Sequence, residues 1–249
     1  MIDWQAQWDS FVLEFITKKG YLNIFKGLGV TMQIAIIGLI LGIIIGTLIA
    51  TIRVLPKYKL IVKIFDKICS VYVAFFRGTP MIVQLLVGYW VLFPVLGISI
   101  DGILVASIIF GLNSGAYVSE IMRGGINSVD KGQMEAGRAV GLSFGTTMIK
   151  IVIPQAVKNI MPTLGNEFIT LIKETSVVYF ISVVDLCRSF QQLGGPSSQF
   201  VVPYLVMAVF YIVIVLIVSL LVKLLEKIFS KYDKTSSKYK SKNSKKIAG

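Results

Sequence analysis

The sequence contains no histidine and only two cysteines among its 249 residues. Histidine is the commonest metal-ligating side chain and a frequent general base, so its absence argues against zinc-dependent and many hydrolytic sites. Cys69 and Cys187 lie far apart in the chain without the spacing of a metal site, and we interpret them as packing residues. We therefore expect no bound metal and no cofactor.

Charged residues are also scarce, at 15% of the chain, whereas soluble domains usually carry about 25%. The N-terminus lacks a signal-peptide pattern, because Asp3, Asp9 and Glu14 stand where positive charge is expected. The chain also lacks the Gly-x-x-x-x-Gly-Lys-Ser/Thr phosphate loop, so we do not expect it to hydrolyse ATP itself. With 55% hydrophobic residues, the composition predicts an all-α, polytopic membrane helix bundle without enzymatic activity.

Acidic residues are outnumbered by basic ones, 13 against 25, which gives a formal net charge of +12. Such a charge is typical of nucleic-acid-binding proteins, but here the basic residues cluster at the ends of apolar runs. The positive-inside rule places such clusters on the cytoplasmic side of a membrane. We therefore exclude nucleic acid as a partner and use the clusters to orient the chain.

The apolar runs predict five transmembrane helices, because about 20 apolar residues cross a bilayer once. The expected spans are 27–52, 68–100, 103–122, 160–184 and 201–222. The run 68–100 counts as one broken span, since the basic segments 53–67 and 123–150 must face the same side. This arrangement places the N-terminus outside the cell and the C-terminus in the cytoplasm. Gly38, Gly42 and Gly46 form two GxxxG pairs, which suit either packing within the subunit or a dimer interface.

Three regions follow from this pattern. Residues 1–24 are an N-terminal segment whose tryptophans, Trp4 and Trp8, predict a helix lying in the membrane interface. Residues 25–228 form the transmembrane domain, with a polar loop at 129–154. Residues 229–249 are a basic cytoplasmic tail, which is either a solvated topology anchor or a contact for anionic membrane lipid.

The polar loop carries its own helix start and stop signals. Asp130 is placed to cap a helix, with Gln133 in the capping-box position, and Gly141 is placed to end that helix. Ser143 is placed to cap a second short helix that ends before Pro154. We name residues 130–154 the knob, because two short helices joined at a glycine form a bent projection.

Several separated motifs in the chain resemble one protein family. Glu135-Ala136-Gly137, Gly141, Ile151, Ile153 and Pro154 match the EAA loop of bacterial ABC-importer permeases of type I, with Gly137 and Ile153 replacing an alanine and a leucine. The polar amino-acid branch of that family is similar at Arg77-Gly78-Thr79-Pro80, Val83-Gln84, Gly115-Ala116-Tyr117 and 166–176. The resemblance extends over roughly residues 27–227.

The resemblance implies a transport function and a set of partners. The chain would be a permease subunit that pairs with a second permease subunit, identical or homologous, and imports an amino acid by alternating access. A separate cytoplasmic ATPase would bind the knob through a coupling surface made of Glu135, Ala136, Gly137, Gly141 and Pro154. An extracellular or periplasmic amino-acid-binding protein would dock on the outer loops.

Arg77 stands at the expected break of the second span, where a charge costs roughly 2.5–3.5 kcal/mol on insertion scales. Thr79 and Pro80 suit the start of a new helix inside the membrane, whose positive end would face inward. With Gly78 and Thr79, Arg77 then forms a corner that receives the α-carboxylate of an amino acid. The alternative is that Arg77 pairs with Glu120 or Glu167 and only holds the bundle together.

A second polar cluster lies in the expected fourth span. It comprises Asn166, Glu167, Thr170, Lys173, Glu174, Thr175 and Ser176. The family resemblance places part of this stretch on the transport path. Glu167 suits a cationic substrate side chain, and Thr170 and Ser176 suit hydroxyl contacts. A Glu–Lys network without ligand contact is the alternative. Asn113 and Ser114 are further candidates for substrate contact or for polar contact between helices.

Two other classes of function remain to be weighed. An ion-coupled secondary transporter of amino acids would use Glu167 and Glu174 as ion sites, but it would show an inverted repeat and leaves the knob unexplained. An intramembrane enzyme would need a nucleophile with an adjacent base, which the sequence does not suggest.

Overall fold

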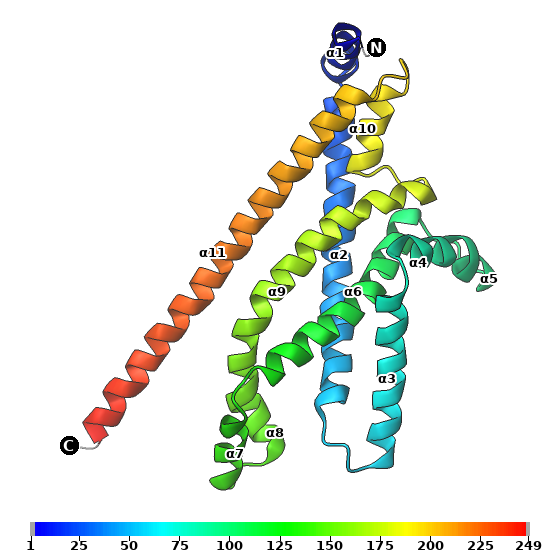
Figure 1. Cartoon of the computed structure of the whole chain (residues 1–249). Helices are drawn as coiled ribbons and strands as arrows, with labels where there is room; N and C mark the ends of the chain where they lie inside the picture. The colour runs from blue at the N-terminus through cyan, green and yellow to red at the C-terminus, as the bar shows by residue number, and fades with distance from the viewer. Residues whose placement is uncertain (1–2, 248–249) are drawn as a thin grey trace. The chain divides into compact units, whose positions relative to one another are not determined.

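The structure is a computed structural model that describes residues 3–247, with side chains described through residue 227. Every regular element in the described range is helical, so the all-α class is confirmed (Figure 1). The elements are α1 (Trp4–Val12), η1 (Leu13–Thr17), α2 (Tyr21–Val54), α3 (Leu60–Gly78), α4 (Met81–Val87), η2 (Gly88–Leu92), α5 (Phe93–Val95), α6 (Gly102–Asn127), α7 (Lys131–Ala139), α8 (Phe144–Thr147), η3 (Met148–Val152), α9 (Ile153–Glu174), η4 (Thr175–Ile181), α10 (Leu186–Gly194) and α11 (Val201–Ile247).

The helices form two compact units. The first comprises residues 1–120 and 167–215, and the second comprises 121–166 and 216–249. Three helices, α6, α9 and α11, run in the chain from one unit into the other.

The first unit is organised around α2 and the part of α6 that belongs to it. The glycines of the GxxxG pairs face α6: a methyl group on Gly42 would lie 2.7 Å from Ser114 Cβ, and one on Gly46 would lie 2.7 Å from Val118 Cβ. In return, Gly111 and Gly115 of α6 receive Leu41 and Ile45 of α2. The glycines therefore allow close packing within the subunit, one of the two roles expected for them.

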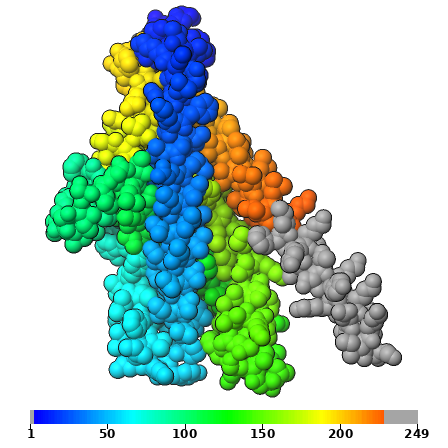
Figure 2. Space-filling model, turned by 180° about the vertical axis from the view of Figure 1, so that it is seen from behind, coloured from blue at the N-terminus to red at the C-terminus, as the bar shows by residue number. Residues whose placement is uncertain are grey.

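The opposite side of α2 is exposed and apolar. Figure 2 shows α2 as a long ridge on the surface of the molecule. Ile36, Ile40, Ile44 and Leu48 recur along it at four-residue spacing and are each about half exposed. A stripe of this kind suits contact with lipid.

The second expected span is broken where the sequence indicated. α3 and the helix that begins with α4 meet at a bend of 106° within three residues of Gly78. Three other helices, α2, α6 and α11, are long and apolar enough to cross a membrane, and the bent pair is a fourth candidate among the described residues. The expected span 160–184 corresponds to α9 and η4, which do not meet that test because polar residues interrupt them.

The second unit contains the knob and the helix segments that support it. Gly125 of α6 lies against Ile160 of α9, where a methyl group would come within 2.3 Å of Ile160 Cγ1. Asn159 Nδ2 donates to Ser128 Oγ at 2.7 Å, which adds a polar contact between α9 and the residue after α6. The base of the knob is thus fixed to α6 by both packing and hydrogen bonding.

Two expectations about helix ends are wrong. The second helix of the knob does not stop at Pro154, because α8, η3 and α9 continue one another from Phe144 to Glu174. Pro154 is the second residue of α9 and follows a π-helical turn, whose altered bonding accommodates the missing proline N–H. The connection between the expected spans 160–184 and 201–222 is not all loop, contrary to the expectation from the sequence, since α10 covers Leu186–Gly194 with Leu186, Phe190 and Leu193 buried.

Candidate functional site

The bend between α3 and α4 is held by the side chain of Gln84, which was not among the expected site residues. Its Nε2 donates to Phe76 O at 2.8 Å, to Thr79 O at 3.0 Å and to Thr79 Oγ1 at 2.8 Å. Backbone carbonyl groups at the end of α3 have no helical partners beyond the break, and they accept hydrogen bonds from Gln84 instead. A lone glutamine in the apolar run 81–100 was the signal in the sequence that could have identified it.

Thr79 does not cap α4 as expected. Pro80 occupies the N-cap position without a side-chain cap bond, and Thr79 Oγ1 instead donates to Phe75 O at 2.8 Å. The hydroxyl completes the end of α3 rather than the start of α4. Gly78 has open space around it, since a methyl group there would meet no atom within 4 Å.

Arg77 lies at the end of α3 with an exposed side chain. Its guanidinium is stacked over the ring of Tyr117 on α6, with Cζ 5.3 Å from the ring centroid, a cation–π contact. The two acidic partners considered for Arg77 are engaged elsewhere, because Glu120 pairs with Arg53 and Glu167 accepts from Ser114. The guanidinium thus keeps hydrogen-bonding capacity for an anionic group.

Two consecutive residues of α6 contact two different elements. Asn113 Nδ2 donates to Gln84 Oε1 at 2.9 Å and to Phe76 O at 3.2 Å, which ties α6 to the bend. Ser114 Oγ donates to Glu167 Oε1 of α9 at 2.9 Å. Both side chains are buried. Asn113 and Ser114 thus connect the polar residues at the bend with Glu167 of α9, which the sequence placed in separate spans.

The polar residues of α9 and η4 are only partly brought together. Glu167 and Glu174 are half-buried, whereas Lys173 is exposed. Among the described residues no ion pair joins Lys173 to either glutamate. Ser176 Oγ donates to Lys173 O at 3.0 Å. Thr170 is half-buried, and Asn166 is exposed one position before Glu167 on the same helix.

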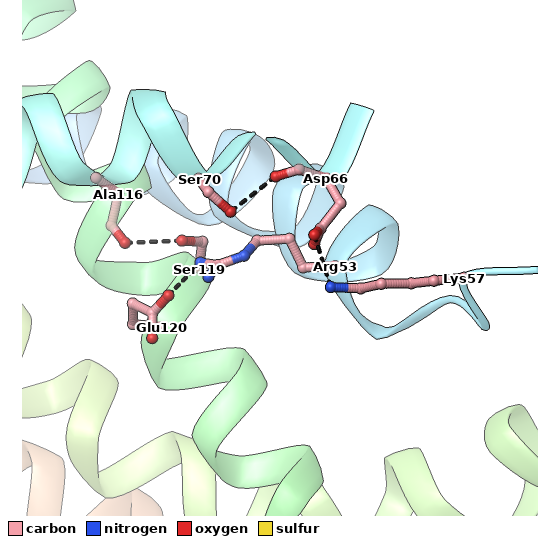
Figure 3. Close-up of polar contacts among 7 residues, drawn as sticks. All are labelled: Arg53, Lys57, Asp66, Ser70, Ala116, Ser119 and Glu120. Carbon is pink, nitrogen blue, oxygen red and sulfur yellow. Dashed lines mark hydrogen bonds and ion pairs between the residues drawn. The ribbon is translucent and has the colours of Figure 1, made fainter. Parts of the chain in front are cut away.

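An ion pair joins α2 to α6 at the end of the first span. Figure 3 shows Arg53 of α2 directed at Glu120 of α6, and the two side chains are 17% and 18% exposed. Nearby, Lys57 Nζ lies 2.6 Å from Asp66 Oδ2, which links the α2–α3 connection to α3. The sequence placed Arg53 only as one of several cytoplasmic basic residues.

The knob has the predicted caps and bend. Asp130 Oδ1 accepts from Gly132 N at 2.7 Å, and Ser143 Oγ accepts from Thr146 N at 3.2 Å. Between the two helices Gly141 has φ +86°, a left-handed conformation that favours glycine. Leu142 N then donates to Gly137 O at 3.0 Å, which closes the end of α7. The reciprocal capping-box bond of Gln133 is replaced, because its side chain accepts from Gln155 Nε2 at 3.3 Å.

The expected coupling residues divide between the inside and the surface of the knob. Gly137 is buried against Thr147, where a methyl group would lie 2.4 Å from Thr147 Cγ2. Glu135, Ala136, Gly141 and Pro154 are exposed. Val140 and Ile149 are 76% and 67% exposed, so the surface of the knob also carries apolar side chains.

The described residues contain no group of three or more histidine, cysteine, aspartate or glutamate side chains that could hold a metal ion. The backbone groups, amides, hydroxyls, guanidinium and carboxylates of this region supply hydrogen bonds and charge.

Residues 38–231 match the family described as "Binding-protein-dependent transport system inner membrane component". The chain belongs to this family. As such it is a multi-pass inner-membrane protein and a transport component rather than a catalytic enzyme.

Relatives of this inner-membrane component carry amino-acid transport names. The arginine transport system permease protein ArtQ of Bacillus subtilis (strain 168) is 39% identical over 196 residues, which cover 77% of this chain and 85% of ArtQ. The putative glutamine transport system permease protein GlnP of Rickettsia typhi (strain ATCC VR-144 / Wilmington) is 37% identical over 205 residues, which cover 82% and 91%.

Solved structures share the fold. A chain in the crystal structure of an amino acid ABC transporter with histidines is 32% identical, with a TM-score of 0.78, and the match covers 91% of this chain and 99% of that chain. A chain of the inward-facing MetNI methionine ABC transporter is 16% identical, with a TM-score of 0.70 and coverage of 84% and 97%, and supports the fold alone.

Proposed function

We propose that this inner-membrane component is a permease subunit of an ATP-driven amino-acid importer. Its relatives are named as arginine and putative glutamine permeases, and its knob bends at Gly141, as expected of a loop that couples to an ATPase. The observation that carries the proposal is the hinged knob at 130–154 within a chain of this family. An ion-coupled secondary transporter would have no use for such a knob.

The substrate path in this proposal runs past the bend and past α9. Arg77, with Gly78 and Thr79 beside it, receives the α-carboxylate, because its guanidinium is exposed and stacks on the ring of Tyr117 rather than pairing with Glu120 or Glu167. Glu167 receives a cationic side chain, which favours a basic amino acid and agrees with the arginine named for ArtQ. Ser114 orients that carboxylate, while Asn113 holds the helices. Asn166, Thr170, Lys173 and Ser176 complete the polar lining.

The proposal includes partners and an orientation. A cytoplasmic ATPase binds the exposed face of the knob, with Glu135 and Val140 at its surface. A second permease subunit completes the path, and an amino-acid-binding protein docks outside. Five spans place the N-terminus outside and the C-terminus inside, with 160–184 as a span stabilised by protein contacts on its polar side. The side chains of the tail 229–249 lie outside those described.

The function is tested by purifying the tagged chain from its native membrane under mild conditions. An ATPase is expected to co-purify, and in liposomes its activity should rise several-fold when binding protein loaded with amino acid is added. The increase should be largest for a basic amino acid. Uptake against a gradient by the chain alone, without nucleotide, would contradict the proposal and favour an ion-coupled carrier.

The assignment of Glu167 is tested by Glu167→Gln, which keeps the shape and the acceptor for Ser114 but removes the charge. A hydrogen bond to a charged group contributes about 1.5–3 kcal/mol, so arginine uptake at saturating binding protein should fall at least about tenfold. Uptake of glutamine through the same complex should change less than about threefold. Equal losses of arginine and glutamine uptake would show that Glu167 stabilises the helix bundle rather than contacting the substrate. Normal uptake by Arg77→Ala would likewise remove Arg77 from the path.

A further inference from the structure

The bend of the second span depends on a buried amide. Gln84 is only 7% exposed, and its nitrogen faces the backbone oxygens of Phe76 and Thr79 at the end of α3. A helix that stops within a membrane leaves carbonyl groups without partners, and hydrocarbon offers none. One side chain from the first turn of α4 thus supplies donors to the end of the preceding helix, across a turn of 106°.

A second buried amide holds the first one in place. Asn113 on α6 is 4% exposed, and its nitrogen donates to Gln84 Oε1 and also to Phe76 O. Because backbone oxygens can only accept, both amides are fixed in orientation, with nitrogen toward the end of α3. The amide nitrogens of both side chains and the oxygen of Gln84 therefore have hydrogen-bond partners within the protein.

The same face of α6 also carries the ring under Arg77. Tyr117 follows Asn113 by four residues, so the two side chains lie on one side of the helix. Asn113 contacts the backbone of the residue just before Arg77, and Tyr117 contacts the Arg77 guanidinium itself. The position of this guanidinium relative to α6 is therefore set from both sides, by an amide contact to Phe76 O and by the stacked ring.

We propose that Gln84 and Asn113 form a positioning pair, here named the amide clasp, that fixes the bend angle and with it the place of the Arg77 guanidinium on the substrate path. The second part rests on the proposed transport function; the first does not. The hydrogen bonds of Gln84 and those donated by Asn113 Nδ2 are to protein groups, so we assign both residues a positioning role rather than a contact with substrate. The clasp acts on substrate through Arg77.

The clasp makes a structural prediction that does not need transport. In a variant with Cys69 and Cys187 replaced by serine, spin labels at Val71 on α3 and Val95 on α5 report the bend angle, and both positions are exposed. We expect one narrow distance distribution in the reconstituted wild-type complex. Gln84→Met and Asn113→Leu, which keep the side-chain length or shape but lose the amide, should each broaden or shift it. Ser107→Ala is the control, because its buried hydroxyl bonds only within α6, to Ile103 O at 2.8 Å.

The functional test is a pair of double-mutant comparisons on uptake. Each single variant of the clasp should lower the maximal rate about tenfold, and Gln84→Met with Asn113→Leu together should be no worse than about twofold below either one. Adding Gln84→Met to Arg77→Ala should cost less than about threefold, since the clasp acts through that arginine. Losses that multiply in both comparisons would overturn the proposal.

The outcomes separate the two proposals. Unchanged distances in both clasp variants would overturn the clasp even if uptake fell. Shifted distances in a complex whose wild type shows no ATP-driven uptake would uphold the clasp and reject the importer function. Should Gln84→Met fail to fold, Asn113→Leu remains the milder variant, because it leaves the bonds from Gln84 to α3 intact, and its distances alone decide the first part.

Discussion

Replacing Gly137 with valine is expected to lower ATP-driven uptake at least about twentyfold while leaving the protein in the membrane. A side chain at this position would lie 2.4 Å from Thr147 Cγ2 and 2.8 Å from Thr147 Oγ1. Thr147 cannot easily turn away, because its hydroxyl donates to Ser143 O at 3.0 Å. Overpacking of this kind costs about 1–3 kcal/mol, so α7 must move away from α8 and the knob loses the shape required by the contact with an ATPase that we propose.

The measurement is the ratio of amino acid transported to ATP hydrolysed in liposomes, with membrane insertion checked by purification yield. Gly145→Ala is the matched control in the same knob, since a methyl group there meets no atom within 4 Å. A pair of smaller substitutions tests the contact itself. Gly137→Ala should impair coupling. Adding Thr147→Ala to it should restore coupling, because the nearest remaining atom of residue 147 is then Cβ, at 3.2 Å. Wild-type coupling in Gly137→Val would mean that the two knob helices need not touch.

The knob shows what its sequence could and could not predict. Asp130, Gly141 and Ser143 act through local backbone chemistry, so their caps and the bend follow from residue type and spacing. Gly137 differs, because its contact is with a residue of the next helix. The EAA pattern has alanine at that position, and here the methyl of Thr147 occupies the space which that alanine would need. The contact between Gly137 and Thr147, ten residues apart, could not be predicted from the spacing of residues within one helix.

The bend of the second span is a similar case. Arg77-Gly78-Thr79-Pro80 interrupts an apolar run, and the break follows from the absent proline N–H and from the polar residues. The pairing of the side chains at the break was not predictable, because Gln84 and Asn113 are 29 residues apart and meet only after α6 folds against α4, although the lone glutamine marked Gln84 as unusual. Thr79 was assigned to the wrong helix end, since a threonine between two helices can complete either one.

Two helix ends were predicted wrongly from the sequence, because packing outweighed the local start and stop signals. Pro154 is a helix-stopping residue, yet a π turn before it lets the helix continue. The segment 188–199 contains glycine and proline, but α10 forms ahead of them because Asp185 caps it and its apolar residues at four- and three-residue spacing are buried. The helical spacing of Leu186, Phe190 and Leu193 was the signal in the sequence for this helix.

The second large effect is expected at the ion pair between Arg53 and Glu120. These side chains lie 67 positions apart in the chain and join α2 to α6 in a site where each is less than a fifth exposed. Breaking a largely buried ion pair by removing one partner costs about 3–5 kcal/mol, because the remaining charge stays in a site of low dielectric constant. Glu120→Ala and Arg53→Ala should therefore each lower the free energy of unfolding by about 3 kcal/mol, measured by denaturant unfolding in detergent micelles.

We expect replacement of both charges to destabilise the protein much less than removal of either charge alone. Methionine at both positions fills similar volume without leaving a charge, so Arg53→Met with Glu120→Met should lie within about 1 kcal/mol of wild type, far less than the sum of the single losses. Lys57→Ala is the control, because it breaks a nearby pair whose lysine is 49% exposed, and such pairs contribute about 0–1 kcal/mol. Single and double losses that simply add would show that Arg53 and Glu120 stabilise the bundle through separate contacts, and that the pairing drawn in Figure 3 carries no coupling of its own.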